Sequence, residues 1–269
     1  MAKSANPAGK HAKPVVPKDR QFVTSLARGL SLLRCFSSVN PERGATELAR
    51  MTGLPQPTVW RLCHTMIELG FLTPVQGSDK LRLGTPILGL GYAVLAGNPV
   101  SEIARPHMEA IANKYQGSVS LAERDGLEMI FLQRCKGRSV VLDFNIGSRV
   151  PIGFSASGWG YIAAVAPDER LRIFRELRTT SASQWRSVKP KLDFALLAYE
   201  RSGYIISKGI SHSMVNAVAV PVTSSSKAVR LILSSGGINS IFDDARLKLV
   251  GEDLKALADT LRPSLRAAG

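Results

Sequence analysis

The chain has 269 residues, of which 45% are hydrophobic, so it is long and apolar enough to build one large or two ordinary domains with buried cores. A formal net charge of +14 indicates a polyanionic partner, with a generally basic soluble protein as the alternative. No apolar run approaches membrane-spanning length and no apolar signal core precedes the first domain, so we expect a soluble, cytoplasmic protein without a membrane partner.

Residues 1–20 are rich in Lys, Ala and Pro, and Asp19 is their only acid. This composition cannot bury a core and predicts a disordered basic arm. The arm either follows DNA phosphates or the minor groove, or is a solvated tail without a role. The first 100 residues hold twelve Lys/Arg and five Asp/Glu, so the positive charge is denser at the front of the chain.

A helix is predicted from Ser25 to Phe36, with Leu26, Leu30, Leu33 and Phe36 on one face. A turn through Asn40, Pro41 and Gly44 leads into the stretch from Ala45 to Leu72. That stretch predicts a short helix, a turn at Thr52-Gly53-Leu54 and a longer helix from Pro55 to Leu69, which Gly70 ends.

The longer helix has a buried stripe and a polar face. The stripe, at three- and four-residue steps, is Val59, Leu62, Cys63, Met66 and Leu69. The opposite face has hydrogen-bonding groups and a cation but no carboxylate before Glu68, which favours contact with DNA in a major groove. The candidate DNA-binding residues are Thr46, Gln56, Pro57, Thr58, Trp60, Arg61, His64 and Thr65. An ordinary helical hairpin remains the alternative for this segment alone.

The next residues predict a β-hairpin in which Leu72–Val75 and Lys80–Leu83 flank the polar tip 76–79. Three helices followed by such a ribbon is the order of a winged helix-turn-helix, and its wing would bring Lys80 and Arg82 to the DNA backbone.

The segments SLARGLSLLRCF, ATELARMTGLPQPTVWRL, ELGFL and LRLG, in this order, resemble the N-terminal domain of the IclR family of bacterial transcription regulators. Thr85-Pro86 starts a short amphipathic helix, Ile87–Ala96, and Gly97-Asn98-Pro99 marks a boundary. The resemblance implies that this helix links two domains and contributes to dimer contacts. We therefore expect an arm at 1–20, a DNA-binding domain at 21–85, a linker helix at 86–98 and an effector-binding, oligomerising domain at 99–269.

The second half predicts an α+β domain with a largely antiparallel sheet. The expected strands are Val119–Glu123, Met129–Gln133, Val140–Phe144, Gly203–Ile210, Val215–Val222 and Val229–Ser234. The expected helices are 104–115, Asp168–Leu177, Lys191–Ser202 and Asp243–Leu265. SRVPIGFSASGWGYIAA and ERSGYII…VNAVAVPV resemble the effector-binding domain of the same family, a relative of the GAF and PAS folds.

Catalytic, cofactor and metal sites are not expected. The three cysteines lack Cys-x-x-Cys spacing and the four histidines lack partners at metal-binding spacing. Ser155 and Ser157 lie in a glycine-containing turn, but a nucleophile elbow needs glycine where Ser157 stands, and no acid–His pair completes it.

That turn, just before a helix start, favours binding of a carboxylate, with a purely structural turn as the alternative. The resemblance implies an effector pocket formed by Ser155, Gly158, Trp159, Ser207, Asn216, Ala217 and Ser235. Many members have Lys where this chain has Trp159, acids where it has Ser207-Lys208-Gly209, and serine where it has Leu233. These differences favour a ligand with an aromatic or apolar body and an anionic end, with core or dimer packing as the alternative role of Trp159.

The sequence thus predicts a regulator, most simply a repressor of a catabolic operon, whose binding to operator DNA responds to a small organic or aromatic acid. It would act as a homodimer or homotetramer on a roughly palindromic site. The alternatives are a sensor module that uses its helix-turn-helix for protein contacts, and a small hydrolase.

Overall fold

The computed structural model describes residues 21–138, 144–223 and 229–266. The chain divides into two compact units, Met1–Val94 and Leu95–Gly269, and helix α4 (Pro86–Ala96) spans the division. The predicted arm at residues 1–20 lies outside the described residues. Among the described residues no single helix is long and apolar enough to cross a membrane; α4 and the next helix pass that test only as a pair bent by 78°.

The first unit has three helices and a small antiparallel sheet. Its elements are α1 (Thr24–Leu33), β1 (Glu42–Gly44), α2 (Ala45–Thr52), α3 (Gln56–Glu68), β2 (Leu72–Pro74) and β3 (Lys80–Leu83). The strand order is β1-β3-β2, so the expected two-stranded ribbon has a third strand where we expected only a turn. β1 is too short to show alternation in sequence, and only its pairing with β3 defines it as a strand.

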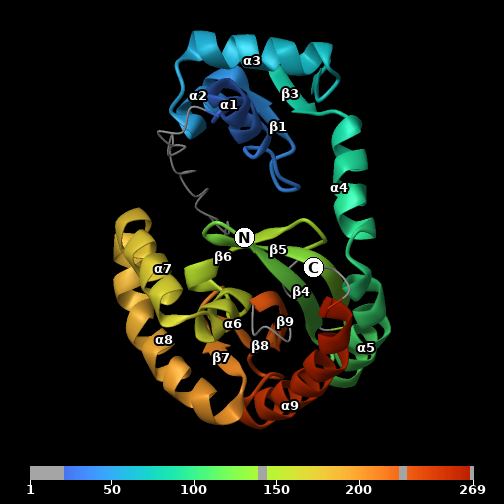
Figure 1. The fold of residues 1–269 in the computed structure, drawn as a ribbon, viewed down its shortest axis with the longest axis vertical. Coiled ribbons are helices and arrows are strands. Elements are labelled where there is room, and N and C mark those ends of the chain that lie inside the picture. The colour runs from blue at the N-terminus through green and yellow to red at the C-terminus, as the bar shows by residue number, and fades with distance from the viewer. Residues whose placement is uncertain (1–20, 139–143, 224–228, 267–269) are drawn as a thin grey trace. The chain divides into compact units, whose positions relative to one another are not determined.

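In the α2–turn–α3 segment, the helix boundaries lie at the glycine and proline residues from which they were predicted. Gly53 adopts a left-handed conformation, φ 68°, and its N–H donates to the carbonyl of Ala49, which ends α2. Pro55 precedes the first residue of α3. Val59, Cys63 and Met66 of α3 are buried, and Figure 1 shows α3 running across α1 and α2.

The predicted apolar face of α1 is wrong at two positions, whereas that of α3 is wrong only at Leu69. On α1, Leu26 and Leu30 are 61% and 52% exposed, whereas Gly29 and Leu32 are buried. The reason is close packing at Gly29, where an added Cβ would lie 3.0 Å from Cε of Met66, so the face with Gly29 and Leu32 packs inward and Leu26 and Leu30 face outward. On α3, Leu69 is exposed because the helix ends at Glu68.

Helix α4 was expected to be amphipathic, and this too was wrong. It buries none of its residues, and its apolar side chains occur on all sides. Leu88, Leu90, Tyr92 and Val94 are exposed.

The second unit contains a six-stranded antiparallel sheet in the order β6-β5-β4-β9-β8-β7. The strands are β4 (Ser118–Asp125), β5 (Glu128–Lys136), β6 (Arg149–Pro151), β7 (Ile205–Lys208), β8 (Val215–Thr223) and β9 (Val229–Ile238). Of the strand expected at Val140–Phe144, residues 140–143 lie outside the described residues and Phe144 is not in a strand. The short β6 was not expected.

Helices cover both faces of this sheet (Figure 1). α5 (Pro99–Tyr115) and α9 (Asp244–Leu261) pack on one face, and η1 (Ile152–Phe154), α6 (Ala156–Ala164), α7 (Pro167–Thr180) and α8 (Ala182–Ser202) cover the other. α8 starts well before the expected Lys191, because it continues through Pro190. α9 ends at Leu261 and gives way to the 3-10 helix η2 (Arg262–Arg266).

The expected fold class, a winged helix-turn-helix unit followed by an α/β domain with an antiparallel sheet, is confirmed.

Candidate functional site

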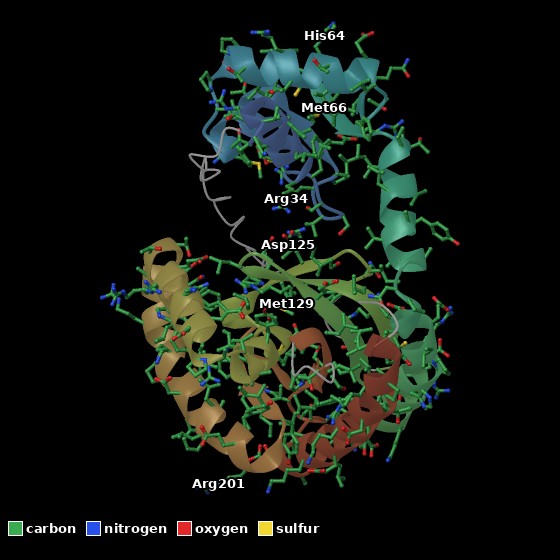
Figure 2. The ribbon with its side chains drawn as sticks, viewed as in Figure 1. Arg34, His64, Met66, Asp125, Met129 and Arg201 are labelled. Atoms are coloured by element: carbon green, nitrogen blue, oxygen red, sulfur yellow. The ribbon has the colours of Figure 1, made fainter. Side chains whose placement is uncertain are left out.

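The outer face of α3 exposes the predicted polar side chains. Gln56, Pro57, Trp60, Arg61, His64 and Thr65 are exposed, and Thr58 is half-buried. Figure 2 shows His64 on the outer side of α3 and Met66 on the inner side, toward α1. The helix therefore buries its apolar stripe and leaves a face with one arginine, one histidine and a tryptophan that is 55% exposed.

Thr46 lies in the first turn of α2, next to the start of α3. The amide nitrogen of Gln56, Nε2, donates to the hydroxyl oxygen of Thr46 across 3.1 Å. The two exposed polar groups, ten residues apart in sequence, thus form one contiguous surface at the adjoining starts of two helices.

Lys80 and Arg82 stand on β3, on either side of the buried Leu81. Because side chains alternate along a strand, both cations point away from the core of the first unit. Both are exposed.

The second unit contains a pocket between the first turn of α6 and the sheet, with about 550 Å³ of space including its open mouth. Serine hydroxyls and two aromatic rings dominate its lining. The serines on its wall include Ser118, Ser120, Ser155, Ser157, Ser211 and Ser234.

Arg134 of β5 supplies a positive charge to this pocket. It stands opposite Ser120 in the sheet and donates to the Ser120 hydroxyl across 2.8 Å. Its guanidinium carbon lies 5.4 Å and 5.6 Å from the ring centres of Phe131 and Phe144. No Asp, Glu or Lys is among the described residues that line the pocket, so a positive charge beside two aromatic rings suits an anion with an aromatic body.

The hydroxyl of Ser155 makes its hydrogen bonds within the turn that starts α6. Its hydroxyl donates to the carbonyl of Pro151 across 2.8 Å and accepts from the N–H of Gly158 across 3.1 Å. By contrast, the hydroxyl of Ser157 also borders the pocket and makes no hydrogen bond with the described residues.

Gly158 and Trp159 pack against the backbone of this turn and do not line the pocket. A Cβ on Gly158 would lie 2.0 Å from the carbonyl oxygen of Ile152. Trp159 is 1% exposed, and its indole N–H donates to the carbonyl of Gly153 across 2.9 Å.

Only some of the predicted residues in the last strands line the pocket. Ala217 lines the pocket, whereas Ser207 and Asn216 do not, and the Asn216 amide donates to the carbonyl of Phe242. Ser235 borders the pocket, but it stands opposite Val119 and Val218, which belong to the core formed with α5 and α9. Opposed residues share a face, so the hydroxyl of Ser235 points away from the pocket.

Ser234, which was not predicted as a site residue, stands opposite Ser120 on the pocket face. Arg134, Ser120 and Phe131 were missed as well. The alternation of Ser118 and Ser120 with Val119 and Leu121 was a usable signal for the serines. The placement of Phe131 and Arg134 depended on pairing between β4 and β5, which shifts at a bulge between Leu121 and Ala122.

The three cysteines are free thiols buried in the two units. Burial raises the pKa of Cys35 and of Cys135 to about 11. Such thiols are protonated at neutral pH and react slowly. Within the described ranges, no three His, Cys, Asp or Glu side chains are grouped so that they could hold a metal ion.

Comparison with known proteins finds two family models in the chain. The IclR helix-turn-helix domain matches residues 25–76, and the bacterial transcriptional regulator IclR C-terminal domain matches residues 92–262. The HTH-type transcriptional regulator TsaQ1/TsaQ2 of Comamonas testosteroni is 31% identical over 251 residues, which cover 92% of this chain and 90% of that protein.

Two solved structures share the fold. An IclR family transcriptional regulator from Brucella abortus is 37% identical with a TM-score of 0.83, covering 90% of this chain and 93% of that one. An IclR homologue from Microbacterium hydrocarbonoxydans, complexed with 4-hydroxybenzoate, is 24% identical with a TM-score of 0.71, covering 91% of this chain and 100% of that one.

Proposed function

This chain belongs to the IclR family of bacterial transcriptional regulators, and from that premise we propose that α3 reads operator DNA while the C-terminal unit binds a small organic or aromatic acid. The chain is a helix-turn-helix transcriptional regulator. We propose that it represses a catabolic operon and that the acid modulates its binding to the operator. The proposed division of the chain is DNA binding at 21–85, a linker at 86–98 and effector binding with oligomerisation at 99–269.

The exposed polar face of α3 carries the DNA-binding part of the proposal. A helix that buries Val59, Cys63 and Met66 while exposing Arg61 and His64 can enter a major groove without unfolding. Lys80 and Arg82 on the wing supply phosphate contacts beside it. The density of positive charge in the first 100 residues supports the same partner.

Arg61→Ala tests this contact. If Arg61 pairs with a guanine, the variant loses about 1–3 kcal/mol of specific binding while nonspecific binding changes little. Arg28→Ala, which removes an exposed arginine from α1, is the matched control and should bind like the wild type. Unchanged operator binding by Arg61→Ala would remove this residue from the interface.

The pocket beside α6 carries the effector part of the proposal. Arg134 has five N–H donors, so it can keep its bond to Ser120 and still take a ligand carboxylate. The rings of Phe131 and Phe144, 5.8 Å apart, offer packing for an aromatic body. The Microbacterium homologue was crystallised with an aromatic acid, which supports this choice of ligand class for a shared fold.

Paired ligands test the role of Arg134. Benzoate and 4-hydroxybenzoate should bind wild-type protein more tightly than their neutral amides, by about 1.5–3 kcal/mol for a hydrogen bond to a charged group. Arg134→Gln should abolish that difference, whereas Arg105→Gln, an exposed arginine on α5, should preserve it. Isothermal titration measures both. Equal binding of acids and amides by the wild type would contradict the proposal.

We further propose that the protein acts as a homo-oligomer on a roughly palindromic operator and that it has no catalytic role. Exposed leucines on α4 support the first point, because they offer an apolar surface for a second copy of the chain. A homodimer would present two recognition helices about 34 Å, or a multiple, apart, which is what a palindromic operator requires. The hydroxyl of Ser155 is hydrogen-bonded within the turn before α6, which supports the proposal that it is not a catalytic nucleophile.

A further inference from the structure

We propose that Gln56 reads an adenine in the operator and that Thr46 holds the Gln56 amide in the orientation that this reading requires. The inference rests on the proposed DNA contact of α3. It assigns a base to one side chain and a positioning role to another.

Gln56 occupies the place on α3 from which a recognition helix reaches base edges, its first residue. Its amide nitrogen donates to Thr46 Oγ1 across 3.1 Å, and both side chains are exposed. Pro57 follows Gln56 and fixes the backbone at the start of the helix. The amide is therefore held at the surface by a neighbouring helix and not only by its own rotamer preference.

The chemistry of the amide selects the base. Its nitrogen carries two hydrogens, so one can donate to Thr46 while the other remains beside the carbonyl oxygen. A paired N–H donor and C=O acceptor match adenine, whose major-groove edge offers N7 as acceptor and the N6 amino group as donor. Guanine offers two acceptors there, N7 and O6, and would oppose the Gln56 carbonyl.

Thr46 makes this orientation the favoured one. A threonine hydroxyl has one donor hydrogen and two acceptor lone pairs. The first turn of α2 has no side-chain cap, and its one acid, Glu47, is paired with Arg43, so this turn favours a DNA phosphate nearby. If the hydroxyl donates to phosphate, it can only accept from Gln56, which keeps the amide nitrogen toward Thr46 and prevents a flip.

The arrangement also lowers the cost of recognition. A free glutamine loses rotamer freedom when it pairs with a base, and a side chain already held by a neighbour loses less. Phosphate, Thr46, Gln56 and base would then form one hydrogen-bonded chain in which the backbone contact positions the base contact.

The test uses full-length protein and a duplex selected from random sequence for tight binding. Each adenine of one half-site is replaced in turn by 7-deazaadenine, which lacks the N7 acceptor, and binding is followed by fluorescence anisotropy. We expect one position at which the replacement weakens wild-type binding about 5- to 10-fold, the loss of one hydrogen bond. Gln56→Ala should bind both duplexes equally at that position.

Exchange of the same A·T pair for G·C should weaken wild-type binding about 5- to 150-fold, and Gln56→Ala should not distinguish the two pairs. Thr46→Val, which removes the hydroxyl at nearly constant shape, should lose most of this discrimination, and Thr46→Ser should keep it. Circular dichroism confirms that each variant is folded before its binding is compared.

Each outcome has one meaning. If Gln56→Ala keeps the wild-type preference at every position, the assignment of adenine is wrong. If Thr46→Val discriminates as well as the wild type, Thr46 does not position the amide. If the wild type shows no sequence preference on any duplex, the proposed DNA-binding function fails instead.

Discussion

Ser155 and Gly158 show how single residues define the turn that opens α6. The Ser155 hydroxyl is held by the Pro151 carbonyl and the Gly158 N–H, and Gly158 lets the backbone of Ile152 approach within a distance that no side chain allows. The sequence identified this glycine- and serine-rich turn beside a ligand site. It did not reveal that the hydroxyl of Ser157, not that of Ser155, has no partner among the described residues.

Gly158→Ala should destabilise the C-terminal unit by about 1–3 kcal/mol, because its Cβ would meet the backbone oxygen of Ile152 and the chain would have to shift. Thermal unfolding measures the loss. Gly89→Ala on α4 is the control: no atom lies within 4 Å of its added Cβ, so it should be neutral or slightly stabilising. Equal stability of the two variants would contradict the close approach.

The buried thiol of Cys35 should make stability depend on alkaline pH. Burial raises its pKa from 9.0 to about 11, so the folded state holds this proton more tightly than the unfolded chain does. The resulting stabilisation is complete below pH 9 and is lost as the pH rises toward 11. In urea unfolding across this alkaline range, the free energy of unfolding of Cys35→Ala should therefore fall less with rising pH than that of the wild type. Equal decreases in the two proteins would show that the Cys35 thiol is not the cause.

At the scale of elements, α1 and α4 expose more apolar surface than their sequence patterns suggest. Leu26 and Leu30 on α1, and Leu88 and Leu90 on α4, are each more than half exposed. Isolated exposed leucines are ordinary on protein surfaces, but a helix with no buried residue and many apolar ones is typical of an interaction surface. A second copy of the chain is the partner that the proposed palindromic operator requires.

Replacing Leu88 and Leu90 together by glutamine should raise the dissociation constant of the homo-oligomer, since each leucine covered at an interface is worth about 1.5–3 kcal/mol. Sedimentation velocity measures the change. Unfolding of the separate units should be little altered, because both side chains already face solvent. Leu249→Gln on α9, which removes another exposed leucine, is the control; equal effects of the two changes would count against α4 as an interface.

At the scale of the whole molecule, charge is the property that most constrains the partner. The net charge of +14 is shared between the two units, but its density is greater in the first 100 residues. Polyanion binding by such a chain is driven partly by release of counterions, so its affinity depends on salt.

Deletion of residues 1–20 removes five Lys/Arg and one Asp. If this arm binds phosphates, the slope of log affinity against log salt concentration should become shallower by about 0.9 for each phosphate that the shortened protein no longer neutralises. Anisotropy titrations between roughly 50 and 200 mM salt would measure it. A slope that matches that of the full chain would assign the arm no electrostatic role in DNA binding.

Local sequence signals determined much of this protein. Gly53, Pro55 and Gly70 bound the helices of the helix-turn-helix, and the three- and four-residue spacing of Val59, Cys63 and Met66 indicated which side of α3 is buried. The ordered motifs also identified the family, which the comparisons confirm. These signals are readable because each depends on residues within one or two turns of one another.

Only the tertiary structure decided which side chains meet in the pocket and which leucines remain outside. Arg134 faces Ser120, and Ser234 rather than Ser235 faces the pocket, because of strand pairings that join residues far apart in sequence. A shift of one residue in such a pairing reverses the face of every side chain, and the bulge after Leu121 introduces one such irregularity. Likewise, α1 turns Leu26 outward because Gly29 packs against Met66 of a different helix.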